Sequence, residues 1–291
     1  MVLKYHGYPS SFQKRFMKIV VDVRRVCARV GIVLNYEQGN EPTKEDNMGT
    51  TKIEWCDKSW NPVTGCTAIS EGCQNCYAKR MANRLRGRAG YPEDDPFKVT
   101  FHPDRLHDPL KWKKPCRVFV CSMGDFFHKD VPRDWQENVL GVASNNQRNI
   151  FIFLTKRPEQ MMLFFKGRSS PANCWLGVTA ENQRCADERI PILLDIPAAV
   201  HFVSVEPMLG PVDIIDPLNG FPQQTSEEEW EQTAPSLDWV IAGPETGQKA
   251  RPCQSKWIEH LQVQCCDAEV PFFDKRFHNC IKREWPKQKK E

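Results

Sequence analysis

Short apolar runs recur along the chain and are separated by longer stretches in which polar and apolar residues mix. Most members of these runs are β-branched or aromatic, which is typical of strands. The runs cover residues 117–121, 150–154, 175–178, 201–205, 239–242 and 270–273. Several are apolar at nearly every position, as expected of strands in a parallel sheet that helices cover. The pattern therefore predicts an alternation of strands and helices.

A further candidate strand near residues 61–63 brings the number of strand–helix units to six or seven. Units of this kind and number predict an α/β fold, a partial or full β/α (TIM-like) barrel. The polar segment 218–237, which is rich in Glu, Gln and Pro, is expected to be a solvated insertion between the fifth and sixth units. The barrel domain is expected to span residues 48–291.

Residues 1–47 have a different character from the rest of the chain. Phe12, Phe16, Ile19 and Val23 fall on helical spacing among Lys and Arg residues, and a polar linker follows at 40–47. Met48 directly precedes the first strong motif. The segment is therefore predicted to be an N-terminal extension, either an appended helix with a linker or a stretch upstream of the true start.

Charge and hydropathy narrow the class of protein. The chain has 40 Lys and Arg against 37 Asp and Glu, a net charge of +3 that gives no sign of nucleic-acid binding by itself. No apolar run approaches the roughly 18–20 residues of a membrane helix, and no secretory signal opens the chain. We expect a cytoplasmic protein with no membrane partner. Its thirteen cysteines are then expected to be reduced, and clustered ones indicate metal binding or catalysis.

Three cysteines are clustered. Cys66, Cys73 and Cys76 follow a C-x6-C-x2-C spacing in a loop that contains Gly65 and Gly72, which allow close wrapping around a ligand. Three thiolates from one loop can ligate three irons of a [4Fe-4S] cluster and leave the fourth iron for a chelating cofactor. The spacing therefore favours a cluster.

The alternative is a structural zinc site completed by a ligand such as Cys56 or His102. Zinc sites normally use a second close pair of ligands, and no second C-x2-C occurs in the chain. This alternative corresponds to a different class of protein, a non-catalytic accessory protein with a structural metal. It stays open at this point.

The segment 51–80 resembles a phage-associated family of unknown function that is defined by a three-cysteine motif, and the resemblance extends over nearly all of residues 51–285. Its Gly65-Cys66, Gly72-Cys73 and Cys76-Tyr77-Ala78 elements are also similar to those of the spore photoproduct lyase and DNA repair photolyase-like group of radical SAM enzymes. One departure is the first gap between cysteines, which has six residues here and three in the usual radical SAM loop.

The resemblance implies a barrel of the radical SAM type that uses two cofactors, a [4Fe-4S] cluster and S-adenosylmethionine (SAM). Such an enzyme reduces the sulfonium of SAM and releases methionine and a 5'-deoxyadenosyl radical, which abstracts hydrogen from a substrate. It implies an electron donor such as a flavodoxin or a ferredoxin as partner. A further partner protein that presents the substrate stays open.

The carboxyl ends of barrel strands are where reacting groups gather. Ser122, Gly124 and Asp125 follow the run 117–121, and the resemblance implies that this segment binds the methionine amino group of SAM, with Asp125 as the acceptor. An ordinary turn capped by Asp is the alternative. Thr155 and Lys156 resemble a Thr-Lys element of the lyase relatives and are assigned to cofactor binding as well.

Two acidic residues are the catalytic candidates. Glu206 follows the run 201–205 and Glu245 follows the run 239–242, so both are expected at one barrel mouth. Other members of the phage family often have Gly-Gly-Glu where this chain has Gly243-Pro244-Glu245. That difference puts the transfer of substrate choice in doubt.

Arg80, Arg84 and Arg88 are spaced four apart on the helix expected after Cys76, with Ala78, Met81 and Leu85 on its buried side. The stripe is either a solvated helix face or a surface that tracks phosphates. Together with the resemblance to lesion-repairing enzymes, it leads us to expect a nucleic acid or nucleotide as the substrate.

Overall fold

The computed structural model describes residues 49–220, 223–224, 230–231, 235–276 and 283–286. The N-terminal extension at 1–47 lies outside these residues, so its separation from the barrel stays a prediction. Within the described part of the chain, no helix is both long and apolar enough to cross a membrane.

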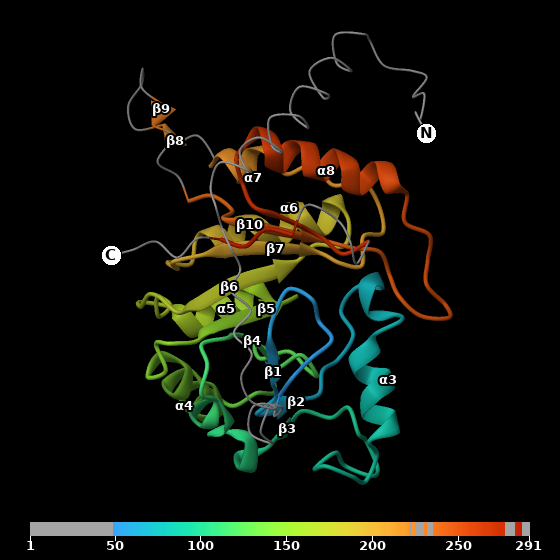
Figure 1. Cartoon of the computed structure of the whole chain (residues 1–291), viewed down its shortest axis with the longest axis vertical. Helices are drawn as coiled ribbons and strands as arrows, with labels where there is room; N and C mark the ends of the chain where they lie inside the picture. The colour runs from blue at the N-terminus through green and yellow to red at the C-terminus, as the bar shows by residue number, and fades with distance from the viewer. Residues whose placement is uncertain (1–48, 221–222, 225–229, 232–234, 277–282, 287–291) are drawn as a thin grey trace, which may run out of the picture. The chain divides into compact units, whose positions relative to one another are not determined.

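Seven parallel strands form the main sheet, in the order β1-β4-β5-β6-β7-β10-β11. They are β1 (Lys58–Trp60), β4 (Arg117–Val120), β5 (Ile150–Thr155), β6 (Cys174–Thr179), β7 (His201–Val205), β10 (Trp239–Ala242) and β11 (Phe272–Asp274). The order in space is the order in the chain, as the colours of Figure 1 show. Among the described residues β1 and β11 are the two edges. The fold is therefore a partial β/α barrel, which confirms the predicted class.

Four helices cover one face of the sheet. They are α4 (Arg133–Ser144), α5 (Pro158–Phe165), α6 (Gln183–Leu194) and α8 (Ser255–Asp267). Their apolar residues, such as Val139, Ile190 and Leu261, form one buried cluster with strand residues such as Phe151 and Leu176. Burying this apolar surface is the main driving force for the fold.

The remaining helices are shorter. They are α3 (Tyr77–Arg84), α7 (Ile215–Asn219) and the 3-10 helices η1 (Glu71–Cys73), η2 (Pro103–Arg105) and η3 (Asp108–Lys111). Helix α3 stands apart from the four helices that cover the sheet (Figure 1).

The opposite face of the sheet carries an aromatic cluster near the start of the strands. It contains Trp55, Phe119, Ile152, Trp175, Phe202, Trp239 and Phe273. The indole Nε1 of Trp285 donates to the carbonyl oxygen of Trp55 at 3.1 Å, and that of Trp239 donates to the carbonyl oxygen of Glu284 at 2.9 Å. Large rings thus fill this end of the barrel, and the carboxyl ends of the strands are left for a functional site.

Two details differ from the sequence expectation. The first strand of the sheet is Lys58–Trp60, upstream of the predicted 61–63. Val63–Thr64 instead forms β2, which pairs antiparallel with β3 (Thr100–Phe101) outside the main sheet. Pro62, which lies inside the predicted strand, has no N–H to donate to a ladder.

The predicted insertion at 218–237 is described only in part. It contains β8 (Gln223–Gln224) and β9 (Trp230–Glu231), an antiparallel pair that is separate from the main sheet.

Candidate functional site

The three cysteines lie on one connection, between β2 and α3. Cys66 opens the loop, Cys73 ends η1, and Cys76 is the N-cap residue of α3. The amide of Gly65 donates to the carbonyl oxygen of Met123 at 3.0 Å, which ties the start of the loop to the segment after β4. Gly65 has a φ of +92°, and a Cβ there would lie 2.1 Å from the carbonyl oxygen of Lys98. Only glycine fits this position.

Gly124 and Ser122 contact the cysteine loop and its surroundings. A Cβ on Gly124 would lie 2.7 Å from the carbonyl oxygen of Gly65, and the two glycines form a β-bridge. The Ser122 hydroxyl lies 3.2 Å from the Asn61 side chain, and its carbonyl oxygen accepts from the Tyr77 hydroxyl. The segment therefore lies close against the cysteine loop. Its contact with SAM stays a prediction.

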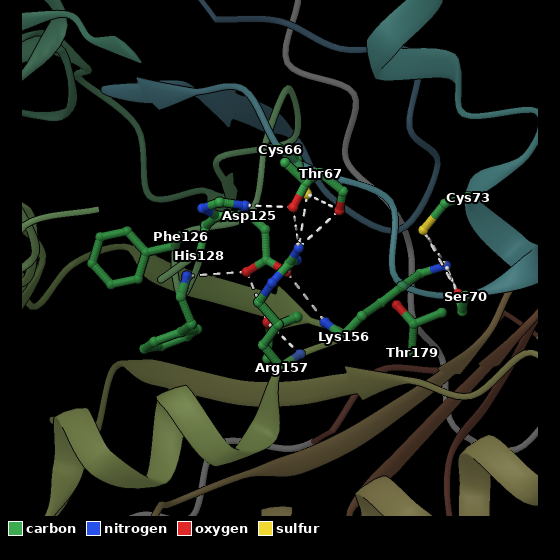
Figure 2. A network of polar contacts seen from close by, with 12 residues as sticks. Cys66, Thr67, Ser70, Cys73, Asp125, Phe126, His128, Lys156, Arg157 and Thr179 are labelled. Carbon is green, nitrogen blue, oxygen red and sulfur yellow. Dashed lines mark hydrogen bonds and ion pairs between the residues drawn. The ribbon is translucent and has the colours of Figure 1, made fainter. Parts of the chain in front are cut away.

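Asp125 is buried and holds two residues at the carboxyl end of β5. One carboxylate oxygen accepts from the Thr155 hydroxyl at 2.7 Å, and the other pairs with Nη1 of Arg157 at 2.8 Å. Arg157 continues into the loop, since its Nη1 lies 3.4 Å from Cys66 Sγ and its Nη2 donates to the carbonyl oxygen of Thr67 at 2.8 Å. Figure 2 shows the guanidinium between Asp125 and Cys66. Asp125, predicted to bind the SAM ammonium, orients Arg157 in this structure.

Lys156 reaches a different part of the loop. Its Nζ lies 3.7 Å from Cys73 Sγ and 3.3 Å from the Ser70 hydroxyl, and it forms an ion pair with Glu181 (Figure 2 shows Lys156 directed toward Cys73 and Ser70). Glu181 is fully buried, and Arg189 of α6 donates to it at 2.8 Å. Burial alone would raise the pKa of Glu181, but Lys156 and Arg189 lower it to about 2. The carboxylate is therefore ionised and held between two cations.

Glu181 also sets the path of the loop, and the sequence analysis did not single it out. Ser70 donates to it, and a Cβ on Gly72 would lie 2.4 Å from its Oε1. The available signal was weak, a polar stretch after β6 and Arg189 eight residues downstream. Arg157 was likewise not singled out, and its contact with Cys66 was not predicted.

Glu245 holds the second half of the loop. Nδ2 of Asn75, which lies between Cys73 and Cys76, donates to its carboxylate at 3.0 Å, and Nη2 of Arg251 donates at 2.6 Å. The hydrogen bonds from Arg251 are the main reason that the pKa of Glu245 is lowered to about 2. Glu206, the other catalytic candidate, instead pairs with Lys275. Catalytic roles for the two acids stay predictions.

Each of the three thiols lies beside a positive group. Cys66 contacts Arg157, Cys73 contacts Lys156, and Cys76 lies at the N-terminus of α3, the positive end of the helix dipole. Burial raises the pKa of Cys66 to about 11, with a contribution from Asp125. Burial also acts to raise the pKa of Cys73, but Lys156 and local hydrogen bonds outweigh it and lower the pKa. The surroundings of Cys73 thus favour the thiolate, the ligand form that iron–sulfur clusters and zinc require, whereas burial and Asp125 favour the neutral thiol of Cys66 in this metal-free structure.

The fourth zinc ligands considered above are engaged elsewhere. Cys56 is buried in the aromatic cluster, before β1, and His102 Nε2 lies 2.8 Å from the Thr64 hydroxyl. Across the ranges that the structure describes, no group of three or more Cys, His, Asp or Glu side chains is arranged to bind a metal ion. The structure therefore shows neither a cluster nor a zinc site among these residues, and both interpretations of the three thiols stay predictions.

The arginine stripe is shorter than predicted. Arg80 and Arg84 lie exposed on α3, but the helix ends at Arg84, and Arg88 follows it beside Gly87, which has a φ of +67°. Met81, expected on the buried side, is 40% exposed because α3 stands apart from the sheet. None of the three arginines forms an ion pair with another described residue.

A family model with the description "protein of unknown function (DUF5131)" matches residues 50–291. The chain belongs to the DUF5131 family. The match includes the cysteine loop and every strand of the main sheet of this DUF5131 protein. No curated protein sequence matches it significantly.

Solved structures of spore photoproduct lyase are similar to the DUF5131 protein at low sequence identity. One, complexed with dinucleoside spore photoproduct, is 9% identical with a TM-score of 0.46, over 84% of this chain and 80% of that chain. A mutant is 8% identical with a TM-score of 0.42, over 90% and 94%. Another mutant, with bound AdoMet and dinucleoside spore photoproduct, is 12% identical with a TM-score of 0.39, over 60% and 57%. A likeness this distant assigns no substrate and no residue role.

Proposed function

We propose that this DUF5131 protein is a radical SAM enzyme in which Cys66, Cys73 and Cys76 hold a [4Fe-4S] cluster. The observation that carries the proposal is the cysteine loop itself, which lies at the carboxyl ends of the strands with a positive group beside each thiol. When bound, the cluster and SAM would supply one-electron radical chemistry at this end of the barrel.

The protein's own residues hold the loop and shape its surroundings. Arg157, Glu181 and Glu245 fasten three parts of the loop to the ends of β5, β6 and β10. Lys156 is the residue best placed to hold the carboxylate of SAM, because its side chain is 18% exposed and already binds a carboxylate, that of Glu181. Four further residues would support that site, because each contacts the loop, a residue beside it or a residue that holds it. They are Ser122, Gly124, Asp125 and Thr155.

The proposal includes a nucleic acid as the substrate class. Arg80 and Arg84 are exposed on the helix that begins directly after Cys76, and neither is neutralised by a described carboxylate. Unpaired guanidinium groups on one surface favour binding of a phosphate backbone. The bound substrate would then lie beside the cluster.

Metal analysis of anaerobically prepared protein tests the cluster. Full-length protein reconstituted with iron and sulfide should contain about four irons and four sulfides per chain and be brown. Cys66→Ala, Cys73→Ala and Cys76→Ala should each lose the iron. Cys266→Ala is the matched control, because Cys266 is exposed on α8, whereas its neighbour Cys265 is buried in the core.

The rival function makes the opposite prediction. A non-catalytic accessory protein with a structural metal would contain one zinc per chain and no sulfide, and that result would overturn the proposal. Addition of AdoMet separates the two further, since an iron with an open position should change its EPR spectrum when AdoMet binds. A structural zinc site has no such open position.

A further inference from the structure

Two consecutive cations at the end of β5 contact different sulfurs of the cysteine loop. Nη1 of Arg157 lies 3.4 Å from Cys66 Sγ, and Nζ of Lys156 lies 3.7 Å from Cys73 Sγ. Lys156 lies at the bend that follows β5 and Arg157 is the N-cap residue of α5, and their side chains reach different parts of the loop. One dipeptide can therefore serve two thiols that belong to different parts of the loop (Figure 2).

Buried carboxylates keep both cations in place. Asp125, 7% exposed, pairs with Arg157 at 2.8 Å, and Glu181, 0% exposed, pairs with Lys156. Arg157 is also held by its hydrogen bond to the carbonyl oxygen of Thr67. Removing either partner of such a pair would leave an uncompensated buried charge. Arg157 and Lys156 are therefore held in place beside Cys66 and Cys73 by their carboxylate partners.

Cys76 differs from the other two cysteines. In the part of the chain that the structure describes, no side-chain nitrogen or oxygen donates to its sulfur, and its surroundings contribute only the N-terminus of α3. The three thiols thus have unequal surroundings, with a guanidinium at Cys66 and an ammonium at Cys73. Arg157 remains charged at all accessible pH values, and its planar group is fixed by two acceptors.

We infer that Arg157, supported by Lys156, sets the reduction potential of the cluster assigned above to this loop. The inference rests on the proposed function. Reduction adds negative charge to a cluster, so a cation and an N–H donor at a cysteinyl sulfur stabilise the reduced state and raise the potential. Arg157 and Asp125 are positioning and tuning residues in this view, because they act on the cluster through the loop.

The pair offers a test with opposite signs. Arg157→Met removes the positive charge and should lower the potential, whereas Asp125→Asn removes the compensating negative charge and should raise it. A role that is only structural would move both variants in the same direction. Arg157→Lys keeps the positive charge but cannot supply the two guanidinium nitrogens that Arg157 uses. The reduction potential of the cluster in this variant should lie between those of the wild type and Arg157→Met.

Arg276 supplies the matched control. It pairs with Asp274 at the end of β11 at 2.7 Å, another arginine held by a fully buried aspartate at a strand end, and its other described partners, Glu259 and the carbonyl oxygen of Ser255, lie outside the cysteine loop. Arg276→Met should therefore leave the potential unchanged. Thermal unfolding of every variant separates a loss of folding from a change of potential.

The experiment is a potentiometric titration of reconstituted full-length protein, followed by EPR. We expect Arg157→Met to lower the ratio of reduced to oxidised cluster at a fixed electrode potential by tenfold or more, which is about 59 mV for one electron. Variants that carry a full cluster with an unshifted potential would overturn this inference and leave the proposed function standing. A wild type that takes up no cluster would overturn both. If Arg157→Met does not fold, Arg157→Lys and Asp125→Asn decide the question by the sign of their shifts.

Discussion

Glu245 accepts a hydrogen bond from Nδ2 of Asn75 at 3.0 Å, so a carboxylate at the end of β10 holds the two-residue span between Cys73 and Cys76. Arg251 binds the same carboxylate through its side chain and its amide. The segment after β10 and the cysteine loop are therefore joined through one acidic side chain. Glu245, which its place after a strand makes a catalytic candidate, thus also positions the cysteine loop.

Glu245→Ala should loosen the loop and reduce iron retention, because it leaves Asn75 and Arg251 without their acceptor. We expect a loss of roughly 1–3 kcal/mol in the free energy of unfolding, measured in urea. Glu206→Ala is the control, since Glu206 pairs with Lys275 and does not touch the loop. Equal iron loss in the two variants would contradict the assigned contact.

Gly72→Ala should impair both folding and metal binding. Its Cβ would lie 2.4 Å from Oε1 of Glu181, which cannot move aside because Lys156 and Arg189 hold it. Overpacking of this kind costs about 1–3 kcal/mol. Gly141→Ala on α4, where a Cβ meets nothing within 4 Å, should instead be neutral or stabilising by up to about 1 kcal/mol. Urea midpoints and iron content of both variants test the contrast.

His102 should make the fold sensitive to mild acid. Burial is the main reason that its pKa is lowered from 6.5 to about 4, and Arg105 adds to the effect. The unfolded chain therefore takes up a proton on this side chain between about pH 6.5 and pH 4, while the folded protein does not. The contribution of neutral, buried His102 to the free energy of unfolding is therefore fully present above pH 6.5 and is lost as the pH falls from 6.5 to about 4.

Urea midpoints measured from pH 7.5 to pH 4.5 test the effect of His102. His102→Gln can keep a hydrogen bond with Thr64 and should show a weaker dependence on pH over the same range. Parallel curves for the wild type and the variant would show that other groups cause the acid sensitivity.

Arg84→Ala should weaken binding to DNA or RNA by about the same factor for every sequence, because phosphate contacts carry no sequence information. The slope of log K against log salt should decrease by about one unit for the lost contact. Arg184→Ala serves as the control, since Arg184 is exposed on α6 and pairs with Glu188 at 3.0 Å. An unchanged slope, or no binding by the wild type, would favour a peptide or a small molecule as the substrate.

Deletion of residues 1–47 should leave folding and cluster content intact. The first contacts of the described fold begin at Gly49, whose carbonyl oxygen accepts from the amide of Ser59 at 2.7 Å, and at Thr50, which bridges to Lys58. Circular dichroism and iron analysis of the truncated chain test this. Aggregation or loss of iron would mean that the barrel needs the extension.

Two inner strands could be predicted to the residue, while the edges could not. The runs 201–205 and 239–242 coincide with β7 and β10, because strands buried on both faces are apolar at most positions. Strand β1 is an edge of three residues, Lys-Ser-Trp, and has no apolar run to reveal it. At the other edge, β11 starts at Phe272 and not at the predicted 270, because Pro271 cannot donate to the ladder.

The site was predictable as a region but not as a set of contacts. Parallel strands bring their carboxyl ends to one edge, which is why Lys156 and Glu245 were expected near the cysteines. Which residues pair in the site depends on contacts between segments that are far apart in the sequence. Asp125 and Arg157 are separated by 32 residues, and Ser70 and Glu181 by 111. Nothing local to Glu181 indicates that it is buried, so its role required the structure.

The cysteine loop is synthesised long before the side chains that fasten it. Asn75 and Glu245 are 170 residues apart, although the strands pair in the order in which they are made. At about 5–20 residues per second, the loop leaves the ribosome on the order of 10 s ahead of its last anchor. A nascent chain can build most of the sheet in that time while the thiols still lack this support. Completion of the site is therefore a late event in the life of each new chain, because it waits for the segment that follows β10.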